Sequence, residues 1–391
     1  MTDFTESTFT ESEERQELRR QVAKLAKGYG RDWFVERARS GEKTTELWLE
    51  IAKAGYLGIN IPEEYGGGGG GIGDVAAVCE ELAAQGCPLL MMVVSPAICG
   101  TVIARYGTEE QKQQWLPGIC DGTATMAFAI TEPDAGTNSH NITTTARRDG
   151  DEWVLKGQKI YISGVDEAAN VLVVARTEDA RTGKLKPCLF VVPTDAAGFD
   201  YTAIPMEIVS PEKQFQVFID DVRLPREALV GDEDGGLVQL FAGLNPERIM
   251  AASFSTGLAR HAIAKASAYA KERTVFRAPI GSHQAIAHPL AMAHIENELA
   301  RLMTQKASAL VDAGDEMAAG EAANMAKYAA AEAAVHAVDA AVQTHGGNGI
   351  TQEYGMAGLL VAARAGRIAP VSREMILNFV AMHSLGLPKS Y

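Results

Sequence analysis

The segment LNPERIM, residues 244–250, places a carboxylate at the mouth of a long alanine-rich stretch. Asn245, Pro246 and Glu247 are typical of a helix start, which favours an N-cap side chain, a proline at the first helical position and an acid in the first turn. A carboxylate can also act as a general base that removes a proton from a substrate. The pattern by itself leaves both interpretations of Glu247 open.

Two glycine-rich segments could approach a phosphate. GGGGGGIG (66–73) has the spacing GxGxxG, but IPEEY separates the glycines from any preceding strand, which favours a flexible surface loop over a dinucleotide site. QTHGGNGI (343–350) ends an alanine-rich stretch, where Gly346 and Gly347 are typical of a helix C-cap. The same two glycines would also let the backbone approach a phosphate or ribose closely.

Other chemistries have less support. His283, His288 and His294 fall on one predicted helix, but spacings of five and six residues do not align two ligands on one face, so no metal site is predicted. The sequence contains neither a GxSxG elbow nor a GxxxxGK[ST] phosphate loop. No cysteine has a basic neighbour at a helix start that would suggest a nucleophile.

The elements that must position these residues form three stretches, and together they predict an α+β chain. Residues from about 10 to 120 have apolar positions three and four apart, which predicts helices, and Thr108 with Gln111 predicts a capping box. From about 123 to 236 the runs TATMAFAIT, EWVLKGQKIYISG, ANVLVVART, CLFVVPT and QFQVFIDDV predict an antiparallel barrel or sandwich. Long helical patterns then return, so we expect domains at 1–122, 123–236 and 237–391.

Bulk composition restricts the partners. The 391 residues carry a net charge of −14, which disfavours a non-specific nucleic-acid binder and means that an anionic ligand needs a local basic site. Five cysteines without a CxxC pair favour reduced, mostly buried thiols. The acidic first fifteen residues resemble neither a signal nor a transit peptide. The apolar run PLLMMVVSPAICG is broken by Pro96 and too short to span a bilayer, so a cytoplasmic protein is expected.

The stretch TEPDAGTNSHNITTTARRDGDEWVLKGQKIYISG (131–164) resembles the signature of the acyl-CoA dehydrogenase family. Four further segments resemble that family in the same order: GTEEQKQQWLPGICDGT (107–123), AKERTVFRAPIGSHQAI (270–286), QTHGGNGITQEY (343–354) and GRIAPVSREM (366–375). The resemblance implies an N-terminal helical domain, a middle antiparallel β-domain and a C-terminal four-helix bundle. It also implies FAD as cofactor and a homotetramer, a dimer of dimers, with each flavin at a subunit interface.

The resemblance assigns cofactor-binding residues to motifs from both ends of the chain. Those matched to the flavin-binding motifs of the middle domain are Thr131, Gly136, Thr137, Tyr161 and Ser163. The residues matched to the C-terminal motifs are Arg273, Phe276, Gln284, Gln343, Gly347 and Ser372. The resemblance implies that all of these except Ser372 reach the neighbouring subunit's FAD. Arg273 would supply the local basic site, because a guanidinium can bind a pyrophosphate bidentately.

The family removes a proton from Cα and a hydride from Cβ of an acyl thioester. Most members carry the base in a segment IYEGT, where this chain has IAPVS (368–372) with Pro370 in the place of the acid. In the isovaleryl-CoA and long-chain branches the base lies in a sequence like LERL, with which LNPERIM aligns. The resemblance therefore makes Glu247 the catalytic base as well as helix punctuation, and Leu244, Arg248 and Thr137 substrate-binding residues.

Pro370 also lacks the backbone N–H that polarises the thioester oxygen in the family. Either the loop shifts so that the Val371 N–H donates, or polarisation depends on a flavin hydroxyl.

The expected function is FAD-dependent dehydrogenation of an acyl-CoA, with electrons passed to an electron-transfer flavoprotein. Two alternatives stay open: a flavin oxidase or monooxygenase on the same fold, and a non-catalytic partner subunit of a hetero-oligomer. The sequence does not fix the acyl chain, nor CoA against an acyl carrier protein.

Overall fold

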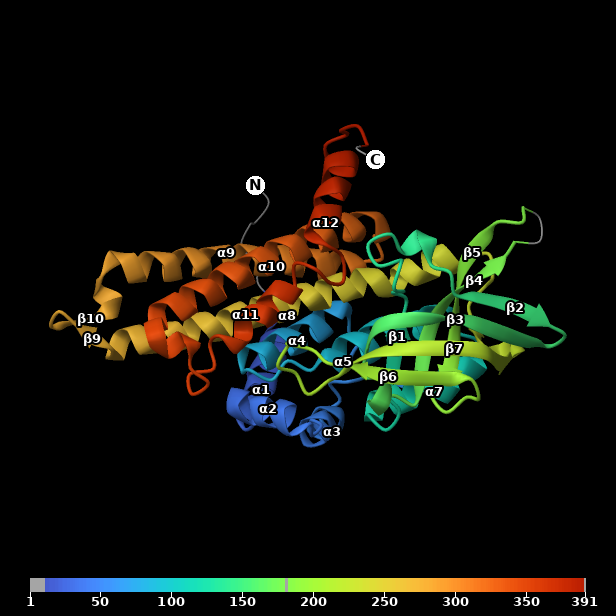
Figure 1. The fold of residues 1–391 in the computed structure, drawn as a ribbon, viewed down its shortest axis with the longest axis horizontal. Helices are drawn as coiled ribbons and strands as arrows, with labels where there is room; N and C mark the ends of the chain where they lie inside the picture. Colours follow the sequence, from blue (N-terminus) through green and yellow to red (C-terminus); the bar gives the residue numbers. More distant parts are fainter. Residues whose placement is uncertain (1–10, 180–181, 390–391) are drawn as a thin grey trace. The chain divides into compact units, whose positions relative to one another are not determined.

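The computed structural model describes residues 11–179 and 182–389, with the elements labelled in Figure 1. The helices are α1 (Glu13–Lys27), α2 (Gly30–Ser40), α3 (Thr45–Lys53), α4 (Ile72–Ala84), α5 (Leu90–Met92), α6 (Thr101–Tyr106), α7 (Glu109–Asp121), α8 (Gly236–Glu272), α9 (Gln284–Asp312), α10 (Glu316–His345), α11 (Gly358–Ala365) and α12 (Arg373–Phe379). The strands are β1 (Met126–Ala129), β2 (Thr145–Asp149), β3 (Glu152–Ser163), β4 (Asn170–Glu178), β5 (Leu185–Pro193), β6 (Phe199–Ile204), β7 (Gln214–Pro225), β8 (Leu229–Val230), β9 (Thr274–Val275) and β10 (Ala278–Pro279).

Contacts divide the chain into two compact units, which we describe separately. The first comprises Met1–Phe34, Ala76–Pro88 and Ile249–Tyr391, and the second Val35–Val75 and Leu89–Arg248. Helix α8 contributes its first part to the second unit and the remainder to the first.

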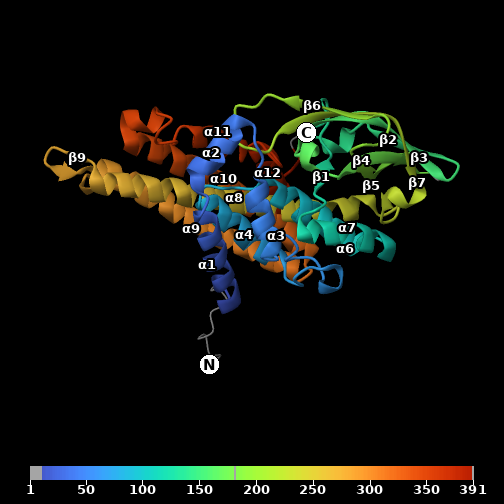
Figure 2. The same cartoon turned by 90° about the horizontal axis from the view of Figure 1, so that it is seen from below.

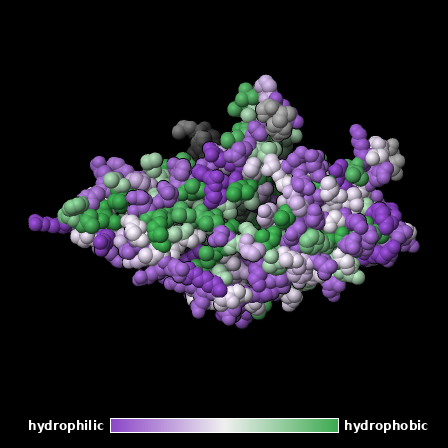
Figure 3. Space-filling view, viewed as in Figure 1, coloured by the Kyte–Doolittle hydropathy of each residue, from purple (hydrophilic) through white to green (hydrophobic). Residues whose placement is uncertain are grey.

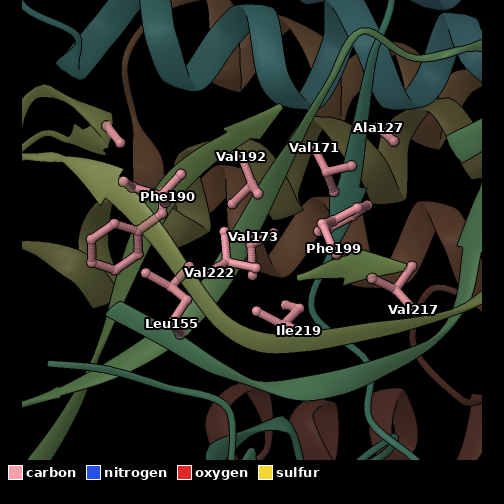
Figure 4. Close-up of a cluster of buried hydrophobic side chains, with 14 of the residues drawn as sticks. Ala127, Leu155, Val171, Val173, Phe190, Val192, Phe199, Val217, Ile219 and Val222 are labelled. Carbon is pink, nitrogen blue, oxygen red and sulfur yellow. The ribbon is translucent and has the colours of Figure 1, made fainter. Parts of the chain in front are cut away.

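An eight-stranded sheet forms the core of the second unit. Its order is β6-β7-β3-β2-β4-β5-β8, with β1 beside β4. Pairing is antiparallel as predicted, except that β1 and a single residue of β2 pair with β4 in parallel. Inward side chains form one buried cluster, part of which is drawn in Figure 4. Within the cluster, Trp153 meets Phe190 edge to face, with ring centroids 5.1 Å apart. All five predicted strands are confirmed. The missed strands β2 and β6 are mostly exposed, so they lack an apolar pattern.

Three long helices dominate the first unit. Figures 1 and 2 show α9, α10 and the later part of α8 side by side. Their contact is lined by alanines that are fully or almost fully buried, among them Ala262, Ala266, Ala334 and Ala337. A methyl side chain permits the close helix–helix approach that the alanine-rich sequence predicts. Together with the β-sheet, this gives a helical N-terminal domain, a β middle domain and a helical C-terminal domain.

The predicted helix start at Asn245–Pro246–Glu247 is wrong. Helix α8 begins at Gly236, so Pro246 lies inside it. The missing N–H of a proline removes one helical hydrogen bond, which surrounding packing can offset. Asn245 is buried, and its side chain accepts a hydrogen bond from Arg248 Nη1 at 3.1 Å instead of capping a helix. Glu247 is therefore not helix punctuation.

The predicted break at Pro96 is wrong for a similar reason. The helix that starts with α5 continues into α6 through the π-helical segment Val93–Gly100, which contains Pro96. A π-helical turn accommodates a residue that an α-helical turn would reject. In the described part of the chain, no helix is long and apolar enough to cross a membrane.

Several local predictions are confirmed. The Thr108–Gln111 capping box is present with both reciprocal hydrogen bonds, and all five cysteines are buried thiols. The glycine loop lies at the surface, preceded by a 3-10 turn rather than a strand. It is held by its own backbone, since Gly68 N donates to Gly58 O at 2.9 Å and Gly70 N to Ile59 O at 2.7 Å. A Cβ at Gly67 would lie 2.0 Å from Ile61 O.

Candidate functional site

The first part of the candidate site is the loop Thr131–Thr137, which leads from β1 towards β2 in the second unit. A short bridge between Glu132 and Ala135 folds the loop back on itself. This leaves Gly136 and Thr137 exposed and Thr131 half-buried. A Cβ at Gly136 would meet only Thr131 Cγ2 at 3.9 Å, so the backbone there is open to a ligand.

Strand β3 brings two further predicted residues next to this loop, because Ile160 N donates to Thr131 O at 2.9 Å. Tyr161 is 57% exposed and has a left-handed backbone, with φ of 59°. Ser163 is half-buried, and its hydroxyl exchanges hydrogen bonds with the Gln214 amide at 3.0–3.1 Å. The structure thus gathers Thr131, Tyr161 and Ser163 at the C-terminal end of β3.

Glu247 lies half-buried in α8, next to the buried side chains of Cys99 and Arg248. The thiol of Cys99, from the π-helical segment, is fully buried; burial and the nearby Glu247 carboxylate raise its pKa well above the usual value. Burial likewise lowers the pKa of Arg248, which is 9% exposed. Arg248 Nη1 donates to the Leu244 carbonyl at 3.3 Å. The sequence did not predict a role for Cys99, because no sequence pattern links residue 99 with Glu247, which lies much further along the chain in α8.

The first unit contains an open hollow of about 390 Å³ at the ends of α8 and α10. Its lining includes two predicted cofactor residues, Arg273 and Gly347. Tyr269 stacks on His345 in the same lining, with ring centroids 4.4 Å apart. Neither Tyr269 nor His345 was predicted. Tyr269 lies on α8 and His345 on α10, so their contact arises only when these two helices pack together.

The lining of this hollow fits a polar, anionic group. Arg273 offers an exposed guanidinium. Gly346, which ends α10 with φ of 58°, and Gly347 leave the backbone open, because an added Cβ would meet nothing within 4 Å. His283 Nε2 is buried and lacks a hydrogen-bond partner in the part of the chain that the structure describes. A phosphate or ribose would satisfy such donors. His283 is the N-cap of α9 rather than a residue within that helix.

Of the remaining predicted cofactor residues in the described part of the first unit, three lie on elements that border the hollow without lining it, whereas Ser372 lies apart from it, beside the middle of α10. Phe276 forms the tip of the β9–β10 hairpin, 93% exposed with φ of 48°. Gln284 begins α9 and Gln343 lies in the last turn of α10, both exposed. Ser372 is the N-cap of α12, its hydroxyl accepting from Met375 N at 3.3 Å. An exposed Phe with a left-handed backbone is a strained arrangement of the kind that clusters at ligand sites.

The loop that replaces the family's usual base segment is held by one buried lysine and one half-buried ion pair of the first unit. Lys327, 1% exposed on α10, donates to the Val371 carbonyl at 2.5 Å. Arg367 and Glu332 form an ion pair at 2.5 Å beside it. The backbone around Pro370 is therefore fixed by its neighbours.

The chain combines a helical, a β and a second helical domain. It carries the open loop Thr131–Thr137 on its sheet and the hollow with Arg273 and Gly347 at its helix ends. These features are those of a flavoprotein oxidoreductase of the acyl-CoA dehydrogenase class. Comparison with known families agrees. The N-terminal, middle and C-terminal domains of acyl-CoA dehydrogenases match residues 12–123, 127–221 and 234–385. The chain belongs to the acyl-CoA dehydrogenase family.

Individual relatives agree over their full lengths. Acyl-CoA dehydrogenase FadE12 of Mycobacterium tuberculosis is 64% identical over 388 residues, 99% of this chain and 100% of that protein. The butyryl-CoA dehydrogenase structure from Megasphaera elsdenii matches at a TM-score of 0.90 with 28% identity, covering 96% of this chain and 99% of the other. A glutaryl-CoA dehydrogenase from Mycobacterium smegmatis, solved in complex with FADH2, matches at 0.88 with 26% identity, covering 97% and 96%. FAD is the cofactor of this family.

Proposed function

We propose that this protein catalyses the FAD-dependent α,β-dehydrogenation of an acyl-CoA thioester, with Glu247 as the base that removes the Cα proton. The observation that carries the proposal is the setting of Glu247 within the family-matched helix α8: a half-buried carboxylate next to a buried arginine and a buried thiol. A carboxylate in such a position can act as a general base. Leu244 and Arg248 on the same helix, together with Thr137 of the loop after β1, are proposed to hold the thioester.

FAD, when bound, accepts the hydride from Cβ. We assign the flavin and its pyrophosphate to Thr131, Gly136, Thr137, Tyr161 and Ser163, where the exposed loop lies beside the bulged end of β3. We assign a neighbouring subunit's FAD to the hollow with Arg273 and Gly347 and to the flanking Phe276, Gln284 and Gln343. We also assign Ser372, at the start of α12, to cofactor binding. An electron-transfer flavoprotein would reoxidise the flavin. A cytoplasmic location and the domain bounds 1–122, 123–236 and 237–391 also remain predictions.

We also propose that the chain assembles as a homotetramer, a dimer of dimers, as the family resemblance implies, and that α9 contributes to one of its interfaces. Four apolar side chains on α9 are 48–63% exposed and repeat every three or four residues, opposite the buried face of that helix: Met292, Ile295, Leu299 and Leu302. Figure 3 shows further hydrophobic side chains, in green, at the surface over the long helices. A stripe with this spacing suits packing against another helix, which we assign to a second copy of the chain.

Replacing Leu299 with glutamate should disrupt this assembly, because a charge in an apolar helix interface is left desolvated and unpaired. We expect smaller particles in analytical ultracentrifugation, together with lower flavin content. His294→Glu, at an exposed position away from the stripe, is the control and should leave the mass unchanged. An unchanged mass for Leu299→Glu would refute α9 as an interface.

Arg273→Ala should lower flavin occupancy while leaving far-UV circular dichroism intact. Loss of a charge-assisted hydrogen bond costs about 1.5–3 kcal/mol, roughly ten- to a hundredfold in affinity. The measurement is FAD titration of apoprotein. The control is Lys271→Ala, which removes a positive charge from the exposed last turn of α8, just before Arg273, and should retain wild-type affinity for FAD. Full occupancy of a demonstrably monomeric form would contradict the interface model.

Two alternatives are separated by one experiment. A non-catalytic partner subunit would show no flavin absorbance, and an oxidase would consume oxygen when given substrate. Anaerobic bleaching of the flavin by a panel of acyl-CoA thioesters, set beside oxygen uptake, distinguishes both from a dehydrogenase. It also identifies the acyl group. A panel without any bleaching would overturn the proposed function.

A further inference from the structure

A buried ion pair lies beneath the loop Thr131–Thr137. Glu132 is 3% exposed and Lys159 is completely buried, with Nζ 2.9 Å from the Glu132 Oε1. Lys159 also donates to the carbonyl of Ile130 at 3.0 Å. Both charges are thus removed from water directly behind residues that we assign to the cofactor.

The Glu132 carboxylate joins the two ends of this part of the chain. Its Oε2 accepts from the Thr143 backbone N–H at 2.5 Å and from the Thr143 hydroxyl at 2.8 Å, and its Oε1 from the Thr144 N–H at 2.9 Å. Burial by itself would raise the pKa of Glu132, but the Lys159 ammonium and these donors hold it at about 2. The carboxylate is therefore ionised at neutral pH, and it ties Glu132, at the start of the segment 132–144, to Thr143 and Thr144 at its end.

The same pair borders the irregular part of β3. Lys159 faces Val217 of β7, whereas the next paired residue, Ile162, faces Phe215, so the register shifts between them. Tyr161 lies within this bulge with its left-handed backbone, and Ile160 N bonds to Thr131 O. A bulge redirects the side chains of a strand. A left-handed aromatic residue persists only where its surroundings over-determine it.

We propose that Glu132 and Lys159 form a positioning pair, which holds the loop Thr131–Thr137 and the bulged Tyr161 in the relative geometry that a flavin requires. This inference rests on the proposed FAD site. Stability alone does not require an ion pair here, because apolar replacement of a buried pair is often neutral or stabilising. What the pair provides specifically is geometry: one carboxylate accepts from Lys159, Thr143 and Thr144, and one ammonium donates to both Glu132 and Ile130.

The test compares Glu132→Gln, Lys159→Met and the double variant. Each single variant leaves one buried charge unpaired, so both should lose thermal stability and FAD affinity. The double variant removes both charges and should regain most of the thermal stability. It should still bind FAD about tenfold more weakly or worse, the order seen when outer-shell partners of a bound group are lost. Lys156→Met is the control, because Lys156 is 63% exposed on the same strand and pairs only with surface acids.

A second readout uses the apoprotein and does not depend on flavin. Hydrogen exchange of the Thr143 and Thr144 amides should accelerate in the double variant and stay at the wild-type rate in the control. A double variant with wild-type FAD affinity and wild-type protection of these amides would overturn the inference. If the wild-type protein binds no FAD, the proposed function fails, whereas the exchange rates still decide whether the pair holds the loop.

Discussion

Glu247→Gln is expected to slow reduction of the flavin by an acyl-CoA about 10²–10⁴-fold or more, the usual contribution of a positioned general base. Glutamine has nearly the shape of glutamate but does not accept the Cα proton. Stopped-flow bleaching under anaerobic conditions measures this step directly. Flavin content and binding of a non-oxidisable acyl-CoA should change little, since neither requires proton transfer.

The fold should tolerate this substitution. Glu247 lies well inside α8 and caps nothing, and glutamine and glutamate have similar helix propensities. Glu272→Gln, at the exposed last residue of the same helix, is the matched control and should retain wild-type rates. Reduction of Glu247→Gln at near wild-type speed would show that the base lies elsewhere.

A second variant asks whether residue 370 can take over the role of Glu247. We expect Pro370→Glu in the Glu247→Gln background to restore part of the rate, as a carboxylate would then stand where most of the family carries its base. Lys327 and the Arg367–Glu332 pair hold this loop in place, so the backbone has a defined position to present it. Partial recovery in stopped-flow bleaching would show that positions 247 and 370 face the same Cα.

Local pattern predicted the elements well but not every boundary. The strands β3, β4, β5 and β7 have strong apolar alternation or apolar runs, and the alanine density of α10 matches its buried face. Asn245–Pro246–Glu247 carried correct start signals in the wrong place. Close packing of the preceding turns outweighs these signals. At Gly243, for example, an added Cβ would lie only 3.0 Å from Ile98 Cγ2, so the helix there packs tightly against its neighbour.

The candidate site could be predicted by residue identity but not by conformation. Tyr161 was found through its motif, yet its left-handed backbone depends on the register shift of β3 against β7, which no local sequence specifies. Cys99 beside Glu247, and Tyr269 on His345, likewise arise from contacts between segments far apart in the sequence. Buried charges such as Glu80 and Glu81 were also missed. Two consecutive acids usually indicate a solvated helix face, and the arginines that pair with these two lie far away in the sequence.

Glu80 is the clearest of these buried charges, and Glu80→Gln should destabilise the protein by about 3–5 kcal/mol, the cost of removing one partner from a buried ion pair. Its carboxylate oxygens lie 2.7 Å from Arg19 Nη1, 3.1 Å from Arg260 Nη1 and 2.5 Å from Arg301 Nε. The side chain is 5% exposed and links four helices of the first unit, α1, α4, α8 and α9. Glutamine retains the shape but leaves the three guanidinium groups with less negative charge.

The pH dependence tests whether charge is the cause. Burial alone would raise the pKa of Glu80, but the three arginines lower it below its usual value. A carboxyl whose folded pKa lies below the unfolded value, about 4.3, stabilises the fold above that pH and loses this contribution as the pH falls through the folded pKa. The protonated acid resembles glutamine, so the unfolding midpoints of wild type and Glu80→Gln should converge in acid. Glu17→Gln, at an exposed pair with Arg20 on α1, should show no difference at any pH. A Glu80→Gln deficit that stays constant down to acid pH would mean that packing, not charge, holds these helices together.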